Sequence, residues 1–363
     1  MTCSGKKGGK VKKALVTVSG SFKLYQAIFL TQLFPEYKWD ILLISYGKKE
    51  EIKPKMKKIC EKAGCFQHIY AAESNILSSE KLKVLIQYSK LLLFYVLGKR
   101  KKCAEGILLR NIECFDYDMF CVAGSYSLIE GAILCFSDQK RVIVMEEGMD
   151  DYVNYTPQFG VVERIGAKLL FKMQYINLMC NNYYEPLKYC EKYMRYPHLI
   201  KENNYSAVKK MFDYSKVNKS IFQEIIRNAF EIMNDEFDTI IYTDPLWTFG
   251  LEDRYCYFTD YIKENYLKKN ILLKRHPQDE YKYDFGELKV TERYTEVPGE
   301  LIMQQWNNAV HIFTFPSTIL LGIELENINY KLVQFHSDNL SYNNVFKELI
   351  DFFKIPERNI IAL

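Results

Sequence analysis

The side chain best placed for acid–base chemistry is a histidine that follows a short apolar run. Residues 271–279 read ILLKRHPQD, so His276 and Pro277 come directly after the run. Proline fixes its own φ and disfavours helix at the residue before it, so we expect His276 to be extended and to point out of a sheet. An imidazole titrates near neutral pH, which suits a proton donor or a phosphate ligand. A histidine in an ordinary turn is the alternative.

Paired carboxylates form a second candidate group. Glu146, Glu147 and Gly148 follow the apolar run RVIVM. A carboxylate at the carboxyl end of a strand could take the proton of an acceptor hydroxyl, and the glycine permits a sharp turn. A solvated acidic turn is the alternative.

Hydroxyl side chains form a third group. Residues 314–318 read TFPST and lie between the apolar run VHIFT and a helical pattern. Ser317 and Thr318 would begin that helix, where free backbone N–H groups and hydroxyls can bind an anion. Ordinary N-capping by serine needs no ligand and is the alternative.

A loop between a strand pattern and a helix pattern carries further acids. Residues 243–254 read TDPLWTFGLEDR and include Asp244, Glu252 and Asp253. The loop is long for its position, and long loops at this end of a sheet tend to carry function. Asp253 is equally suited to cap the helix that follows.

Glycine-rich nucleotide fingerprints are missing from the chain. Ser19 and Gly20 end the first strand pattern with a single glycine, so the GxGxxG signature of a dinucleotide site is absent, as are GxxxxGK[ST], HExxH and GxSxG. This disfavours a dinucleotide-dependent oxidoreductase.

Strand and helix patterns alternate in two series, which predicts parallel, doubly wound sheets. We expect strands at 14–19, 39–45, 66–70, 118–123, 141–145, 239–243, 271–274, 288–291, 310–314 and 331–334. We expect helices at 22–33, 50–62, 82–97, 125–136, 221–233, 257–268, 299–306, 317–325 and 343–353. The strand signal fades over 183–219. We therefore predict an N-terminal Rossmann-like domain at 1–182, a connection at 183–219 and a C-terminal Rossmann-like domain at 220–363.

Composition excludes several classes of protein. The 363 residues are 48% hydrophobic and 26% charged, and the net charge of +4 is too small to favour a nucleic-acid partner. None of the ten cysteines forms a CxxC pair, so we expect reduced thiols, a cytoplasmic location and neither zinc nor disulfides. No secretory signal is visible.

The helix expected at 82–97 precedes the basic run 98–102, which suits peripheral contact with the inner membrane face. A buried helix with a solvated basic end is the alternative.

Taken in order, these motifs resemble those of the bacterial sialyltransferases. Glu146-Glu147-Gly148, His276-Pro277 and Ser317-Thr318 follow the pattern of the lipooligosaccharide sialyltransferases (glycosyltransferase family 52) and of the bacterial polysialyltransferases. The start of the chain, ALVTVSGSFKLYQAI, also resembles the first strand and turn of this family. The order spans most of the chain.

The resemblance implies a fold and a reaction. The fold would be GT-B, with two parallel sheets facing a central cleft. The reaction would be an inverting transfer from CMP-sialic acid to a terminal sugar, galactose being the expected one, on a bacterial surface glycan such as lipooligosaccharide or capsule. It would need no metal and no cofactor beyond the donor.

The resemblance also implies roles for particular residues. His276 would contact or protonate the departing phosphate, Ser317 and Thr318 would hold it, and Pro277 and Lys274 complete the expected donor side. Ser19, Gly20, Glu146, Gly148 and Asp244 are expected on the acceptor side of the cleft.

The identity of the base stays open at this point. The lipooligosaccharide enzymes use an aspartate before the helix that leads to the His-Pro strand, which matches Asp253 with Glu252 beside it. Asp244-Pro245 also resembles that loop. In other bacterial sialyltransferases the acidic pair supplies the base, which would be Glu147.

Two other functions remain alternatives to sialyl transfer. The same fold could use another nucleotide sugar, as a hexosyltransferase, or bind a glycan or nucleotide without catalysis, because fold alone does not decide function. The oligomeric state is open, a homodimer being one alternative.

Overall fold

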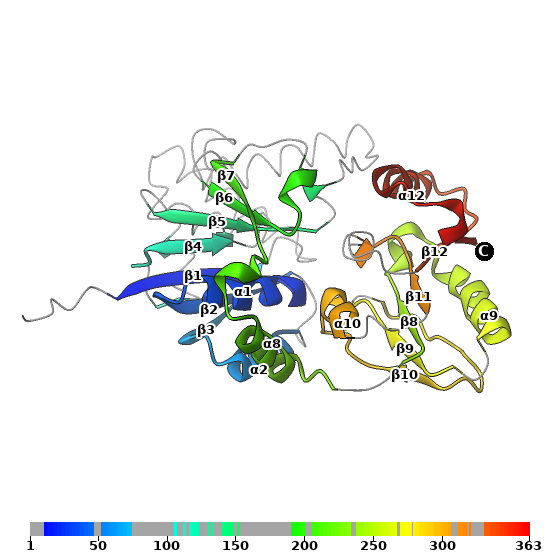
Figure 1. Ribbon diagram of the computed structural model, residues 1–363, viewed down its shortest axis with the longest axis horizontal. Helices are drawn as coiled ribbons and strands as arrows, with labels where there is room; N and C mark the ends of the chain where they lie inside the picture. Colours follow the sequence, from blue (N-terminus) through cyan, green and yellow to red (C-terminus); the bar gives the residue numbers. More distant parts are fainter. Residues whose placement is uncertain are drawn as a thin grey trace, which may run out of the picture. The chain divides into compact units, whose positions relative to one another are not determined.

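A computed structural model provides the structure of the chain. The residues that it describes are 11–46, 52–74, 105–106, 112–113, 116–122, 129–130, 133, 140–148, 151–152, 190–200, 205–233, 237–266, 269–277, 279–305, 311–317, 319–320 and 330–363. They form two compact units: the first ends at Glu231 and the second runs from Ile232 to Leu363, with a short stretch that begins at Gly148 grouped with the second. Figure 1 shows both units.

The first unit is built on a parallel sheet in which β4 is central. Its strand order is β3-β2-β1-β4-β5-β6-β7, and every pair is parallel. The strands are β1 (Lys12–Val18), β2 (Tyr37–Tyr46), β3 (His68–Ser74), β4 (Met119–Val122), β5 (Arg141–Met145), β6 (Cys190–Met194) and β7 (Ala207–Lys210). Strands β4 and β5 and the part of β1 after its two exposed lysines are largely apolar and almost wholly buried, as strands covered on both faces should be.

Helices accompany this sheet on the first unit. They are α1 (Ser21–Leu33), α2 (Ile52–Ala63) and α8 (Lys219–Phe230), with the short helical turns η3 (Pro197–Leu199) and η4 (Tyr214–Lys216). Asn218 caps α8 by accepting from the Ile221 N–H at 3.2 Å. Figure 1 shows α8 beside α2, and Phe222 of α8 packs its ring 5.2 Å from that of Phe29 in α1. Such aromatic packing holds α8 on the first unit.

The second unit is a smaller parallel sheet in which β8 and β11 are central. Its order is β10-β9-β8-β11-β12-β13, again parallel throughout. The strands are β8 (Thr239–Tyr242), β9 (Ile271–Lys274), β10 (Val290–Glu292), β11 (His311–Thr314), β12 (Lys331–Gln334) and β13 (Ile360–Ala362). The helices are η5 (Leu246–Phe249), η6 (Glu252–Arg254), α9 (Tyr255–Asn265), α10 (Gly299–Gln305), α12 (Leu340–Phe353) and η7 (Glu357–Asn359).

Most expected elements appear where the sequence puts them. Strands β5, β9 and β12 have the expected bounds, and the other described elements that we expected begin or end within about four residues of expectation. The parallel α/β architecture is confirmed. The helix expected at 82–97, with its basic run at 98–102, lies outside the described residues, as do most of those expected at 125–136 and 317–325.

The segment expected to connect the domains differs from expectation. Residues 183–219 contribute β6 and β7 to the first sheet, and α8, expected in the C-terminal domain, packs on the first unit. The sequence CEKYM of β6 lacks the continuous apolar pattern that predicts a buried strand, because it contains two charged residues. Lys192 is nevertheless only 1% exposed, since its Nζ donates to the Met145 carbonyl at 3.1 Å.

No helix among the described residues has the length and apolar character that crossing a bilayer requires. The cysteines whose state the structure gives (Cys60, Cys65, Cys121, Cys190 and Cys256) are free thiols.

Close packing of α10 on the second sheet yields a stability prediction. A Cβ added at Gly299 would lie 2.7 Å from Ile319 Cδ1 and 3.3 Å from Tyr242 Cε1. We expect Gly299→Ala to lower the free energy of unfolding by about 1 kcal/mol, because the buried neighbours must shift. Urea unfolding measures the loss. Gly106→Ala is the control, since an added Cβ there meets nothing within 4 Å; equal effects of the two changes would contradict the packing argument.

Candidate functional site

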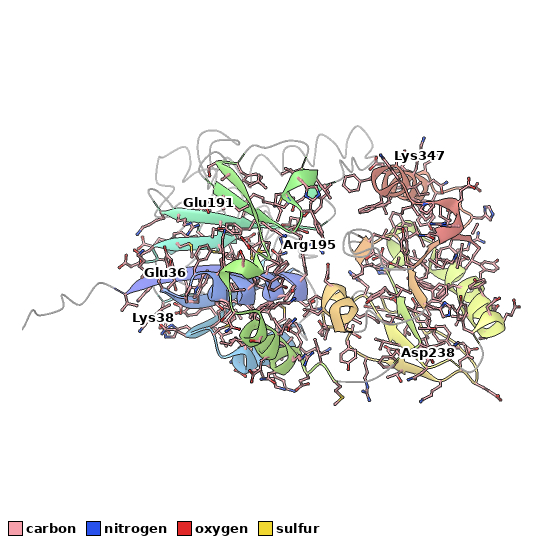
Figure 2. The ribbon with its side chains drawn as sticks, in the orientation of Figure 1. Glu36, Lys38, Glu191, Arg195, Asp238 and Lys347 are labelled. Carbon is pink, nitrogen blue, oxygen red and sulfur yellow. The ribbon has the colours of Figure 1, made fainter. Side chains whose placement is uncertain are left out.

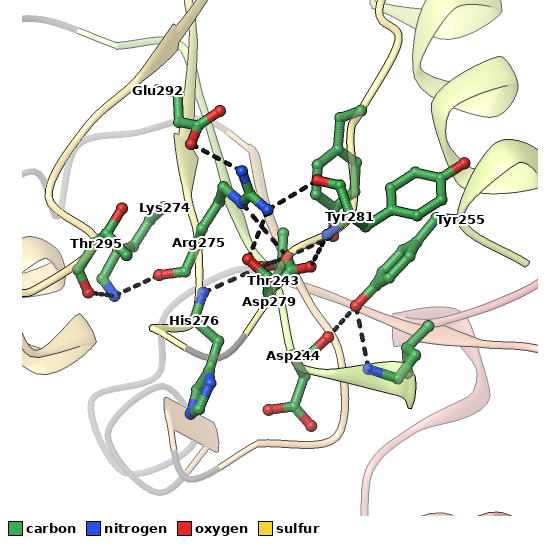
Figure 3. A network of polar contacts seen from close by, with 12 residues as sticks. Thr243, Asp244, Tyr255, Lys274, Arg275, His276, Asp279, Tyr281, Glu292 and Thr295 are labelled. Atoms are coloured by element: carbon green, nitrogen blue, oxygen red, sulfur yellow. Dashed lines mark hydrogen bonds and ion pairs between the residues drawn. The ribbon is translucent and has the colours of Figure 1, made fainter. Parts of the chain in front are cut away.

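The carboxyl edge of the second sheet brings an aspartate and a histidine together. Tyr242 of β8 pairs with Lys274 of β9 in register, so two residues further on Asp244 stands opposite His276. Successive side chains alternate between faces of a strand, so both side chains leave on one side. Figure 3 shows the carboxyl group of Asp244 and the imidazole of His276 extending to the same side of the polar network behind them.

The third strand at this edge adds a hydroxyl. Thr314 of β11 pairs with Tyr242, which places Pro316 level with Asp244 and Ser317 one residue beyond. Ser317 is half-buried, and its Oγ accepts from the Ile319 N–H at 3.4 Å while its carbonyl accepts from Leu320. These bonds are those of a helix cap, so Ser317 has the capping role that the sequence offered as an alternative. Thr318 lies outside the described residues.

The backbone of His276 is held on both sides. Its N–H donates to Thr243 Oγ1 at 3.1 Å, and its carbonyl accepts from the Asp279 N–H at 2.9 Å. Pro277 begins the turn that separates these two bonds. The backbone of His276 is therefore held by two hydrogen bonds, two residues beyond the end of β9.

Asp244 is a carboxyl group with unusual proton affinity. Burial among the loop and strand ends, together with the negative charge of Asp279, raises the pKa of Asp244 from 3.8 to about 8. Its side chain is half-buried, and Tyr255 holds its backbone by donating to the Asp244 carbonyl. A carboxyl group of this kind can exchange protons near neutral pH, as a general acid or base must.

Lys274 is turned away from such chemistry. Its ammonium is buried and donates to the carbonyls of Arg275 at 2.9 Å and Thr295 at 3.2 Å (Figure 3). Burial lowers the pKa of Lys274 to about 8, against the opposing influence of Glu300 and Glu296. The side chain ties the end of β9 to the loop after β10.

Asp253 and Glu252 lie in the exposed turn η6 that leads into α9. The Asp253 carbonyl accepts from the Cys256 thiol at 3.0 Å, a local bond of the helix start. Asp253 is thus an exposed residue at the start of a helix, whereas the side chain of Asp244 is half-buried.

Glu146 and Arg195 form a buried ion pair at the carboxyl edge of the first sheet. Glu146 is fully buried and Arg195 is 6% exposed. Arg195 reaches both carboxylate oxygens, with its backbone N–H at 2.6 Å and its Nε at 2.7 Å. Figure 2 shows Arg195 at the opposite end of the unit from Glu36 and Lys38, which flank the start of β2. Glu146 therefore fixes the end of β6 beside β5.

Glu147 forms an ion pair with Lys23, whereas Glu146 is paired with Arg195. Glu147 is half-buried, and its Oε2 lies 3.5 Å from Nζ of Lys23 in α1. The same ammonium donates to the carbonyls of Met145 and Glu146, and Gln26 donates to the Glu146 carbonyl at 3.1 Å. A cation from α1 thus holds the acidic pair and orients the Glu147 carboxylate.

The glycines of the two expected turns differ. Gly148 has φ of 108°, which a side chain would strain, so it permits the turn after β5 as expected. Gly20 is extended, caps α1 without a side chain and has open space around it, next to the half-buried Ser19.

Several residues of these sites were missed from the sequence alone. Lys23, Lys192, Arg195, Thr243 and Asp279 are buried polar residues that orient the expected ones. Thr243 and Asp279 lie within the two segments singled out, so their position beside His276 and Asp244 was a signal. For Lys23 and Arg195 no local motif exists, because their partners are far away in the chain.

No three His, Cys, Asp or Glu side chains of the described residues are grouped so as to hold a metal ion.

Comparison with known proteins identifies the fold. No family profile matches the chain, and no curated protein matches its sequence. A solved α/β-galactoside α-2,3-sialyltransferase from Photobacterium phosphoreum superposes with a TM-score of 0.52 at 11% identity, over 97% of this chain and 98% of that one. Arabidopsis thaliana UGT89C1 with UDP-L-rhamnose (TM-score 0.49, 10% identity, 98% and 86%) and Acinetobacter baumannii MurG (0.44, 10%, 97% and 85%) are more distant.

The chain therefore has the GT-B fold: two α/β units, each on a parallel sheet whose carboxyl edge carries the candidate site residues. At the identities found, likeness defines the fold and not the substrate.

The proton affinity of Asp244 yields a pH-dependent stability prediction. Between about pH 4 and pH 8 the folded chain keeps a proton that the unfolded chain has released, so this group makes the free energy of unfolding fall as pH rises through that window. Asp244→Asn removes the effect. In urea titrations we measure the free energy of unfolding of the variant minus that of the original chain. We expect this difference to be at least about 1 kcal/mol larger at pH 8 than at pH 5.

Asp253→Asn is the control for this experiment, because it removes a carboxylate from an exposed turn of the same loop. A relative stability of Asp244→Asn that stays constant from pH 5 to pH 8 would contradict the shifted pKa.

The Glu146–Arg195 pair yields a second stability prediction. Glu146→Gln leaves the buried guanidinium of Arg195 without its counter-charge, so we expect a loss of about 3–5 kcal/mol. Lys57→Ala is the control, because it breaks an exposed ion pair with Glu61 on α2 and should cost under about 0.5 kcal/mol. Thermal unfolding compares the two, and a Glu146→Gln loss as small as the control's would refute a structural role for this pair.

Proposed function

We propose that this chain is a glycosyltransferase that moves sialic acid from CMP-sialic acid to a terminal sugar, galactose being the expected one, of a bacterial surface glycan. The observation that carries the proposal is the register of β8 and β9, which sets Asp244 beside His276 at the carboxyl edge of the second sheet. Ligands of such sheets bind beyond the carboxyl ends of the strands. The likeness to a solved sialyltransferase supports the fold that the proposal needs.

His276 would act on the leaving group. When the bond between the anomeric carbon and the phosphate oxygen of the donor breaks, the departing CMP gains negative charge. A protonated imidazole presented at a strand end can donate a hydrogen bond or its proton to that phosphate, and a preorganised donor lowers the barrier where charge develops. Ser317, three residues beyond the end of the neighbouring strand β11, would add a second donor through its hydroxyl hydrogen.

Asp244 would act on the acceptor. The acceptor hydroxyl attacks the anomeric carbon and loses its proton, which a carboxylate must accept. With a pKa of about 8, Asp244 binds that proton more tightly than an ordinary carboxylate would. Turnover should accordingly increase toward pH 8. Asp253 and Glu147 remain the other candidates for this role, the first on an exposed turn and the second held by Lys23.

Two other readings differ in what the site would do with a nucleotide. A hexosyltransferase of the same fold would turn over a UDP-sugar, and a non-catalytic binding protein would bind a nucleotide without transfer. Peripheral membrane contact, a homodimer and a cytoplasmic location stay predictions from the sequence.

The donor is tested by transfer from CMP-sialic acid to a galactoside with EDTA present. We expect release of CMP together with a sialylated product, because the reaction as proposed uses no metal. Turnover of a UDP-sugar without turnover of CMP-sialic acid would refute the donor, and CMP binding without transfer to any acceptor would refute the enzyme.

The roles are tested by four single variants in the same assay. His276→Ala and Asp244→Asn should each lower kcat by about 10²–10⁴-fold, the usual contribution of a general acid or base. Donor KM should change little in His276→Ala. Asp253→Asn and Glu147→Gln are the matched acidic variants, expected to stay within about threefold if Asp244 is the base. Full activity in Asp244→Asn with a dead Asp253 or Glu147 variant would move the base to that residue.

A further inference from the structure

We propose that Thr243 and Asp279 form a positioning pair that fixes the backbone of His276, so that the hydroxyl of Thr243 is required for the geometry of the site and not only for packing. Neither residue touches the expected substrate position, so both would act through His276. The catalytic consequence rests on the proposed function, whereas the positioning itself does not.

The hydroxyl of Thr243 makes two bonds of opposite direction. It donates its hydrogen to Asp279 Oδ2 and accepts the His276 N–H at 3.1 Å (Figure 3). A hydroxyl carries one donor hydrogen and two acceptor lone pairs. Because a carboxylate can only accept, the hydroxyl hydrogen is committed to Asp279, which leaves a lone pair directed at the His276 N–H.

Asp279 is anchored from several directions. The residue is 7% exposed, and its carboxylate accepts from the Tyr283 hydroxyl at 2.7 Å and from the Tyr281 N–H at 3.1 Å. Arg275 forms an ion pair with it, with Nε 3.8 Å from Oδ2. The same guanidinium donates to the carbonyls of Asp279 and Tyr281, which closes the loop that follows Pro277.

Each member of the pair makes one hydrogen bond to the backbone of His276. Thr243 binds the N–H of His276, and the Asp279 N–H binds its carbonyl at 2.9 Å. Both φ and ψ of His276 are thereby constrained, by the residue that follows β8 and by a residue of the loop after Pro277. A site residue held within a fraction of an ångström needs such support, because loops otherwise leave it too loose.

Asp279 also affects the proton affinity of Asp244. Its negative charge contributes to the raised pKa of Asp244. The positioning pair therefore lies behind both candidate catalytic groups, on the opposite face of the strand ends from their side chains.

The chain supplies a matched set of variants. Thr243→Val keeps the size of the side chain and removes the hydroxyl, whereas Thr243→Ser keeps the hydroxyl. Thr239 is the control position: it is buried on the same face of β8, and its hydroxyl has no hydrogen-bond partner among the described residues. Thr239→Val should leave His276 unchanged.

The direct readout is hydrogen–deuterium exchange at the backbone amide of His276, which needs no substrate. We expect Thr243→Val to exchange about fivefold to tenfold faster there than the original chain, the effect of losing one hydrogen bond. Thr243→Ser and Thr239→Val should exchange like the original chain. Unchanged exchange in Thr243→Val, or equally fast exchange in Thr243→Ser, would overturn the positioning role. Asp279→Asn is a second route to the same amide and should also speed its exchange.

The kinetic readout separates this inference from the proposed function. With a donor that turns over, Thr243→Val should lower kcat by about 10–100-fold and leave donor KM within about twofold, because a misplaced catalytic group costs rate rather than binding. Thr243→Ser should restore most of the rate. If faster exchange appears in Thr243→Val while the original chain transfers no sugar, the proposed function fails and the positioning pair stands. A full kcat in Thr243→Val would overturn the catalytic consequence.

Discussion

The parallel register of β8 with β9 and β11 decides which side chains of the second unit can act together. Neighbouring strands lie about 5 Å apart, so residues level with one another at the strand ends are necessarily close. Tyr242, Lys274 and Thr314 are level in this way, and Asp244, His276 and Pro316 each follow one of them by two residues, although 32 and 40 residues separate these three along the chain. A shift by one residue would send each side chain to the other face and separate the aspartate from the histidine.

Buried ion pairs stabilise the strand ends in both units. In the first unit Glu146 binds Arg195, and Lys23 holds the carbonyls of Met145 and Glu146. In the second, Arg275 and Thr243 surround Asp279. A buried charge is tolerated only when paired and hydrogen-bonded, so these clusters cost stability unless they are complete. What they supply is a fixed direction for the groups beside them, namely Glu147 in one unit and His276 in the other.

The two adjacent glutamates after β5, Glu146 and Glu147, have different surroundings. Glu146 is fully buried and paired with Arg195, whereas the Glu147 side chain is 28% exposed and forms an ion pair with Lys23. The sequence offers Glu147 as a candidate base and Glu146 as an acceptor-side residue, and the fold adds that Glu146 is paired with a buried arginine. Asp244 and Asp253 also differ, although both lie in one loop: the side chain of Asp244 extends to the same side as that of His276, and Asp253 lies in the exposed turn η6.

Local patterns predicted what depends on local physics. The run ILLK predicted the bounds of β9 because three successive apolar residues favour a buried parallel strand, and Pro277 marked the segment that follows it. The pattern failed for β6, where Lys192 is buried through a bond to another strand's carbonyl. Sequence position before a helix pointed to Asp253 as a candidate base, whereas the pairing of β8 with β9, which adds Asp244 as a candidate, is not visible in the sequence. The supporting residues Lys23, Arg195 and Asp279 act across long separations, which no local motif encodes.

The central claim is that the carboxyl edge of β8 and β9 binds the donor's phosphate beside His276. The chain has only five histidines, so their ring protons can be followed individually by NMR, and the signal that disappears in His276→Ala identifies this residue. Titration with CMP should shift that signal, while UMP and UDP at the same concentrations should shift it far less. A CMP titration that leaves the His276 signal in place, or a response to UDP alone, would contradict the account.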